Sequence, residues 1–265
     1  MDMDNVTWWL PELHAVLDIP TEPYRPLLTL HKSFSDFLLS DESVCNVKYG
    51  IEAAQIHALL AARCIQLMTA KLKQDICEIR RLDVTPYEVN SETINRFMPL
   101  GLQYACIYWF YHLETSGKPL DNQVCDFLFQ HFLHWLKALS LIGRLPDGAD
   151  ALIILTESIK ASPTMSPEVL AFMKDATRTI SRFGPVIGRS PLQTYASVLL
   201  FSPLASKVRQ MFWNTRLPAS SYVQGVELGW DAHLQARPCP CLNPALHGPL
   251  HSSFRQTVRS WPSQW

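Results

Sequence analysis

Two groups of cysteine and histidine residues have side chains that could bind a metal ion. Cys239, Cys241, His247 and His251 carry thiolates and imidazoles, which are ligands that zinc prefers. Their spacing argues against a zinc site, because the Cys-Pro-Cys pair is closer than the usual knuckle. The gap between Cys241 and His247 is also far shorter than the central spacer of about 12 residues in a zinc finger. We therefore predict no metal site in this segment.

The second group consists of His131 and His134, which stand one helical turn apart in "QHFLHWL". Two imidazoles at this spacing could present two metal ligands, but no Asp or Glu beside them completes a metalloprotease pattern. We interpret both as histidines at the edge of the core, where hydrogen bonds to neighbouring helices would satisfy them.

The sequence contains no motif for nucleotide hydrolysis or nucleophilic catalysis. A phosphate-binding loop ends in Gly-Lys-Ser or Gly-Lys-Thr, whereas the pair Gly117-Lys118 is followed by Pro119. No Gly-x-Ser-x-Gly elbow occurs, and none of the cysteines stands in a known nucleophile signature. The chain is therefore predicted not to be an enzyme and to need no cofactor.

Composition and charge limit the possible partners and the compartment. The 265 residues include 23 Lys and Arg against 24 Asp and Glu, so no net field attracts nucleic acid or acidic lipid. The longest apolar run is shorter than the roughly 20 residues that span a bilayer, and the first residues are acidic where a signal peptide is basic. The 7 cysteines, an odd number, indicate small buried hydrophobes in a reducing compartment. We expect a soluble, cytoplasmic protein that binds neither nucleic acid nor membrane.

The elements that would position these residues are mainly helical. Short apolar runs flank "TEPYR", and the prolines in this region forbid a helix, so residues 13–31 predict a β-hairpin. Ser33 then has capping-box spacing to Asp36 and predicts a helix start. From Gly50 onward the helical period dominates. The fold class is therefore mainly α, with a small N-terminal hairpin followed by an irregular bundle or stack of seven to eight helices.

Caps and breaking residues divide the helical part. Pro99 should kink one helical stretch or split it in two, Asp121 opens the next, and Gly143 ends it. The predicted helical stretches span residues 56–77, 91–117, 121–143, 150–161, 166–183 and 191–213, the last interrupted near Pro203.

The C-terminal segment differs in composition from the helical part. No acidic residue follows Asp231, and the stretch from Arg237 to Trp265 is rich in proline. Roughly the last 30 residues therefore predict a disordered tail.

His31 stands where the hairpin meets the following helix. The stretch "LTLHKSFSDFLL" around it resembles the segment that closes the winged-helix subdomain of signal-transducing NTPases with numerous domains, a class that includes NACHT-type and plant NLR receptors. In that class the histidine of a Met-His-Asp motif contacts the β-phosphate of ADP, so the resemblance implies a nucleotide-sensing role for His31. Leu30 matches the hydrophobic residue, whereas Lys32 replaces the aspartate, and only His31 is carried over. The alternative is a histidine that caps or bridges the hairpin to the helix.

Six blocks in the same order resemble one group of this class, the fungal NACHT and WD-repeat proteins related to vegetative-incompatibility factors. The resemblance covers Leu13 to Trp213 and implies the helical region between the NACHT module and the WD-repeat propeller. It implies a winged-helix remnant with the hairpin over residues 1–45, a helical linker domain over 46–213, and a linker with a disordered tail over 214–265. The blocks are "LHAVLDIP", "LLTLHKSFSDFLL", "LQYACIYWFYHL", "FLFQHFLHWLKALSLIG", "PLQTYASVLLFSP" and "SKVRQMFW".

The stretch "GWDAHLQ", residues 229–235, resembles the sequence that leads into the first propeller repeat. The Gly-His and Trp-Asp signatures of such repeats do not follow it, and no phosphate loop precedes the hairpin. The resemblance therefore implies a truncated fragment that lacks the NTPase and propeller modules.

These observations predict a non-catalytic helical regulatory or coupling segment of a fungal NLR-like signalling protein. It would bind protein partners, and it would bind ADP or ATP only where an NTPase module is supplied. The alternative is a stand-alone helical protein–protein interaction module whose aromatic faces, such as Trp109, Phe110 and Trp135, receive a partner helix. A DNA-reading winged helix would need a basic recognition helix, whereas "SFSDFLLSDES" is acidic.

Overall fold

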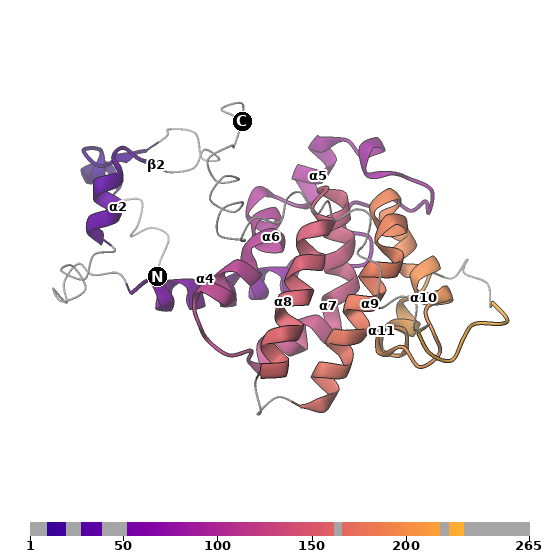
Figure 1. The fold of residues 1–265 in the computed structure, drawn as a ribbon. Helices are drawn as coiled ribbons and strands as arrows, with labels where there is room; N and C mark the ends of the chain where they lie inside the picture. Colours follow the sequence, from indigo (N-terminus) through magenta and orange to yellow (C-terminus); the bar gives the residue numbers. More distant parts are fainter. Residues whose placement is uncertain (1–9, 20–27, 39–51, 162–165, 218–222, 231–265) are drawn as a thin grey trace. The chain divides into compact units, whose positions relative to one another are not determined.

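The fold was obtained as a computed structural model, and it describes residues 10–19, 28–38, 52–161, 166–217 and 223–230 (Figure 1). The described residues up to Ile56 belong to one compact unit, and those from His57 onward belong to a second. The three predicted domains, 1–45, 46–213 and 214–265, stay a prediction.

The first unit contains a two-stranded antiparallel hairpin and a short helix, as predicted. Strand β1 (Leu17–Asp18) pairs with strand β2 (Leu28–Thr29), with Leu17 opposite Thr29. The proline-containing connection, residues 20–27, lies outside the described residues. The hairpin is preceded by the 3-10 helix η1 (Leu10–Leu13) and followed by α2 (Lys32–Leu38).

Eight α-helices, α4 to α11, follow in the described part of the chain, which agrees with the predicted seven to eight. Three short 3-10 helices lie between or after them, namely η2 (Pro86–Glu88), η3 (Pro191–Tyr195) and η4 (Trp213–Thr215). The helices are α4 (Ala53–Lys71), α5 (Ser91–Phe97), α6 (Leu100–Thr115), α7 (Asn122–Leu141), α8 (Leu145–Ala161), α9 (Pro167–Arg189), α10 (Ser197–Phe201) and α11 (Lys207–Phe212).

Local signals set several of these helix ends as predicted. Pro99 separates α5 from α6 and is the N-cap residue of α6. The Asp121 carboxylate accepts a hydrogen bond of 3.0 Å from the Val124 amide and so satisfies one free donor of the first turn of α7. After α7, Gly143 adopts φ +69°, a left-handed conformation that costs glycine little.

Several helix ends differ from the sequence-based prediction, and one of them is the end of α4, which lies at Lys71 rather than at residue 77. Helix α8 begins at Leu145 rather than at Asp150, because Pro146 fits the first turn and Gly148 fits the contact with α7. A Cβ atom at Gly148 would lie 2.5 Å from Leu139 Cδ1, so a larger residue there would force the Leu139 side chain to shift. Helix α9 continues past Pro185 to Arg189 and thereby buries Ile187, although the proline removes one backbone hydrogen bond.

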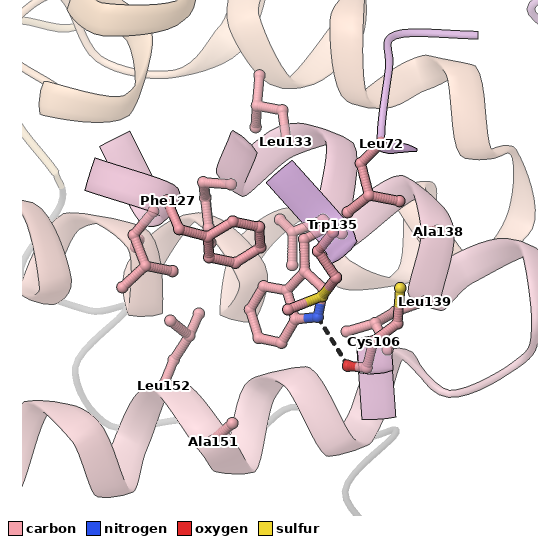
Figure 2. Close-up of a cluster of buried hydrophobic side chains, with 14 of the residues drawn as sticks. Leu72, Cys106, Phe127, Leu133, Trp135, Ala138, Leu139, Ala151 and Leu152 are labelled. Atoms are coloured by element: carbon pink, nitrogen blue, oxygen red, sulfur yellow. Dashed lines mark hydrogen bonds between the residues drawn. The ribbon is translucent and has the colours of Figure 1, made fainter. Parts of the chain in front are cut away.

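Helix α7 is the centre of the second unit. It packs against α6, α8, α9 and η3 (Figure 1), and most of its residues are buried. Figure 2 shows the Trp135 ring among the apolar side chains of this core, with its indole Nε1 donating a hydrogen bond of 2.9 Å to the Cys106 carbonyl of α6. Trp109, Phe110 and Trp135 are 0%, 9% and 1% exposed. The expectation that these three aromatics receive a partner helix is therefore wrong, because they form the core of this chain itself.

Trp109 and Trp135 offer a matched pair for measuring the hydrogen bond in this core. Their rings lie 5.6 Å apart at 77°, but the Trp109 indole nitrogen is buried without a partner in the described part of the chain. Both Trp→Phe changes remove similar volume, and only Trp135→Phe also removes a hydrogen bond. We expect Trp135→Phe to lower the free energy of unfolding by about 1 kcal/mol more than Trp109→Phe in urea denaturation. Equal losses would show that the bond to Cys106 adds nothing.

Candidate functional site

His31 lies at the turn between β2 and α2, where its imidazole forms the N-terminal cap of the helix. The Ser33 amide donates a hydrogen bond of 3.2 Å to His31 Nδ1, and the Ser33 hydroxyl lies 2.8 Å from the same nitrogen. Helix α2 begins at Lys32, so the prediction that Ser33 caps it is wrong. The imidazole replaces the expected hydroxyl, because it can accept from a free first-turn amide equally well. The His31 side chain is exposed, and a contact with nucleotide stays a prediction.

His131 and His134 are both half-buried on α7, and their Nδ1 atoms lie 3.1 Å apart. The His131 ring stacks on Phe127 at a centroid distance of 5.9 Å. Hydrogen bonds to neighbouring helices were predicted for this pair. Burial lowers the pKa of His131, and a hydrogen bond with the backbone of Leu72, directly after α4, raises it. The contact between the two rings themselves lies within α7. Burial, together with the charges on His131 and Lys137, lowers the pKa of His134 to about 4.

A second histidine pair was not found by sequence reasoning. His57 on α4 and His112 on α6 place their Nδ1 atoms 2.8 Å apart, and the Tyr104 hydroxyl lies 2.7 Å from His112 Nε2. Burial, together with the neighbouring His57, lowers the pKa of His112 to about 4. The spacing of Tyr104 and His112 along one face of α6 was a signal that could have linked them. Their contact with His57 depends on tertiary packing, which the sequence pattern does not reveal.

Lys137 is the most deeply buried charged residue of the described chain and is 0% exposed. Its ammonium group donates a hydrogen bond of 2.7 Å to the Gln74 carbonyl and lies 3.8 Å from Asp75 Oδ1. Burial lowers the pKa of Lys137 to about 8, against the charge of Asp75, which raises it. A lysine with such a pKa could act as a base, but a side chain with no exposed surface cannot reach a substrate. Its role is structural, because it connects α7 with the turn after α4.

The backbone of the turn after α4 explains why the charged side chains of Asp75 and Lys137 lie beside it. Two of its residues, Glu78 and Arg80, adopt φ values of 52° and 60°, which are costly for residues other than glycine. The Asp75 carboxylate accepts hydrogen bonds of 3.0 and 2.9 Å from the amides of Ile79 and Arg80 and so fixes this conformation. Lys137 in turn holds Asp75 against α7. Nothing in the sequence pattern pointed to this arrangement.

Asp175 on α9 is a second buried charged residue with several partners. Its Oδ2 atom accepts hydrogen bonds of 2.7 Å from the Ser206 hydroxyl and 2.8 Å from the Val208 amide, both at the start of α11. Its Oδ1 atom accepts a hydrogen bond from the Trp230 indole. One carboxylate thus joins three segments that are far apart in the sequence.

The potential metal ligands among the described residues do not form a cluster. Within the described ranges, no group of three or more His, Cys, Asp or Glu side chains could hold a metal ion. Cys239, Cys241, His247 and His251 lie outside the described residues. Four cysteines are buried free thiols, as predicted, and burial raises the pKa of each: Cys64, Cys77, Cys106 and Cys125.

The described part has a surface groove between α4 and α7. Its volume is about 480 Å³, and its walls carry mostly uncharged polar groups, with Asp126 as the one ionisable side chain among the lining residues. It contains none of the histidines or Lys137. Across the same described part, no helix is both long and apolar enough to cross a membrane.

The described structure defines a mainly α-helical protein with an N-terminal hairpin, whose buried polar groups connect its segments. The chain is similar to the vegetative incompatibility protein HET-E-1 of Podospora anserina, with 30% identity over 233 residues. The similarity covers 80% of this chain and only 17% of that protein. This finding supports the resemblance to the fungal NLR-like proteins. No family model matches the chain, and no solved structure matches it significantly.

The depressed pKa of His112 predicts acid destabilisation. The unfolded chain binds a proton at the ordinary pKa of 6.5, whereas the folded chain binds it only near 4, so stability falls as the pH falls between these values. From about pH 7 to about pH 5 this group should remove about 2 kcal/mol of unfolding free energy. His112→Gln should weaken that pH dependence by the same amount in urea titrations at both pH values.

Ser181→Ala provides the control for this experiment, because it changes no titratable group and the Ser181 hydroxyl bonds within α9. The pH dependence of its stability should equal that of the unchanged protein. A His112→Gln variant with an unchanged pH dependence would contradict the assignment.

Proposed function

We propose that this chain is a non-catalytic helical coupling segment of a fungal NLR-like signalling protein. The proposal is supported by the similarity to a fungal vegetative incompatibility protein and by the order of the six sequence blocks. In an intact relative, such a segment would lie between a nucleotide-binding module and a sensor module and pass conformational changes between them. Its partners would be proteins, and its compartment the cytoplasm.

The observation that carries this proposal is a set of hydrogen bonds in the helical unit that join segments far apart in the sequence. The Gln74 amide donates to the Thr215 carbonyl at 2.7 Å, and the Ser190 hydroxyl donates to the Leu82 carbonyl. Together with Lys137 on Gln74, these bonds connect the turn after α4 with α7, with the α9–η3 junction and with η4. Buried polar groups of this kind are used here to hold segments together rather than to face a substrate. A segment that transmits motion needs such connections, because a displacement at one end must reach the other.

In this proposal, His31 would be the residue that senses the nucleotide state of an NTPase module. Its Nδ1 is engaged by Ser33, so Nε2 is the nitrogen that would face a phosphate. The side chain is exposed on the hairpin unit and could contact nucleotide only where an NTPase module supplies the rest of the site. In the chain as given, the role of His31 is to cap α2.

A stand-alone protein-interaction module is the second candidate, and one observation favours it. Phe201, Leu204 and Leu228 are large apolar side chains that are 51%, 48% and 74% exposed. Exposed apolar groups of this size are common at protein contacts, although scattered single residues also occur on ordinary surfaces.

The non-catalytic role predicts that the purified chain neither hydrolyses ATP nor binds ADP in the micromolar range. Phosphate release and isothermal titration calorimetry measure the two properties. ATP turnover by this chain, or micromolar ADP binding that is lost in His31→Ala, would contradict the proposal. His14→Ala is the matched control, because His14 is an exposed histidine of the same hairpin unit.

The coupling role predicts that the helical unit unfolds as one cooperative body. Ser190→Ala, which removes the bond to Leu82, should lower the same melting transition that Trp135→Phe lowers, by about 1 kcal/mol of stability. Far-ultraviolet circular dichroism and tryptophan fluorescence should give coincident curves.

Ser181→Ala is the control for the cooperativity experiment, because the Ser181 hydroxyl bonds only within α9, to the Thr177 carbonyl at 2.8 Å. It should shift the transition less than Ser190→Ala does. Separate transitions for the two halves of the helical unit would rule out a coupling body of this kind.

A further inference from the structure

Residues 223–230 form a short segment without helix or strand, which is attached to the helical unit at few points. The Leu204 amide donates to the Glu227 carbonyl at 3.0 Å, and the Ala205 amide donates to the Leu228 carbonyl at 2.9 Å. The Trp230 ring packs against Phe183 of α9 at a centroid distance of 6.4 Å. We call this segment, residues 223–230, the strap.

The strap buries little of its own surface. Gln224, Gly225, Glu227, Leu228 and Gly229 are all exposed, and Leu228 is 74% exposed. Segments with few buried apolar contacts open locally at a small fraction of the free energy of global unfolding. The strap therefore depends on its polar attachments, and the strongest of these is the bond from the Trp230 indole to the Asp175 carboxylate, because its acceptor is charged and 6% exposed.

The same carboxylate also fixes the start of α11. One oxygen of Asp175 receives the Ser206 hydroxyl and the Val208 amide, while the other receives Trp230. A movement of α11 against α9 would therefore displace the acceptor that holds the strap. Conversely, a force on Trp230 would act on both α9 and the start of α11 through this carboxylate, in addition to the ring contact with Phe183.

We propose that the strap is a releasable connection whose attachment is controlled by Asp175, and that this carboxylate is the point where the helical unit passes motion to the chain beyond Trp230. This inference rests on the proposed coupling role. Release would break the Trp230–Asp175 bond and the two backbone bonds together. It would leave the helices folded, because α9 and α11 keep their own contacts.

Amide hydrogen exchange of the full chain tests this connection directly. The amides of Leu204 and Ala205 are protected by strap carbonyls, so they report whether the strap is attached. Trp230→Phe keeps an aromatic ring against Phe183 but removes the indole donor. We expect the exchange of these two amides to rise about tenfold or more, with the amides of α7 and α9 unchanged.

Two further variants separate the strap from general destabilisation. Leu228→Ala changes a side chain of the same segment that is 74% exposed and takes part in none of the hydrogen bonds named above, and it should leave the exchange unchanged. Ser206→Ala removes the other side-chain donor of Asp175 and should raise exchange at the start of α11 more than at Leu204 and Ala205.

Two outcomes would overturn the inference. Unchanged exchange at Leu204 and Ala205 in Trp230→Phe would show that the indole bond does not hold the strap. An equal rise throughout α7 and α9 would show that the strap opens only when the whole unit unfolds. Neither result would contradict the proposed coupling role, because other hydrogen bonds also connect the segments. ATP turnover, in contrast, would contradict the coupling role and would say nothing about the strap.

Discussion

The fold of the helical unit depends on one constraint, which is that the polar groups of a nearly fully buried helix must find partners outside that helix. Helix α7 has three such side chains on its central and C-terminal turns. Trp135 donates to the Cys106 carbonyl of α6, Lys137 to the Gln74 carbonyl, and Ser140 to the Ile187 carbonyl of α9 at 2.6 Å. A buried donor without a partner costs about 1–3 kcal/mol, so each bond specifies where a neighbouring element must lie. Apolar burial makes α7 central, and these donors fix its orientation.

The acceptors are backbone groups whose position is thereby fixed as well. The Ile187 carbonyl belongs to the last turn of α9, where the final carbonyls have no partner within the helix. Ser140 supplies that partner from α7 and so determines how α9 ends. The Gln74 carbonyl belongs to the turn after α4, whose left-handed residues need the support of Asp75. The charge on Lys137 therefore contributes to local backbone conformation more than to any chemistry.

The elements that sequence reasoning predicted are those that local signals determine. Asp121, Pro99 and Gly143 act on residues within one turn of themselves, and the hairpin before α2 follows from prolines and apolar runs. The errors have the same origin. The starts of α8 and α2 depend on whether Gly148 meets α7 and whether the His31 ring turns toward Ser33, and both are three-dimensional facts.

The candidate site was less predictable than the fold for a similar reason. The His57–His112 pair and the Lys137–Gln74 bond join residues 55 and 63 positions apart. No spacing rule connects such residues. Sequence reasoning found the residues that resemble known chemistry, such as His31 and His131, but could not find those that only packing brings together.

The distribution of apolar and polar contacts also indicates which parts of the helical unit can move. The apolar core around α7 is close-packed, and a packed core shifts as a body rather than deforming gradually. Its connecting segments are instead held by a few directional bonds, such as those of Ser190 to Leu82 and of Asp175 to Trp230. A directional bond is either made or broken, so each connection has two states while the core keeps one. Conformational change would therefore be confined to the connections, and the helical core would determine which of them respond together.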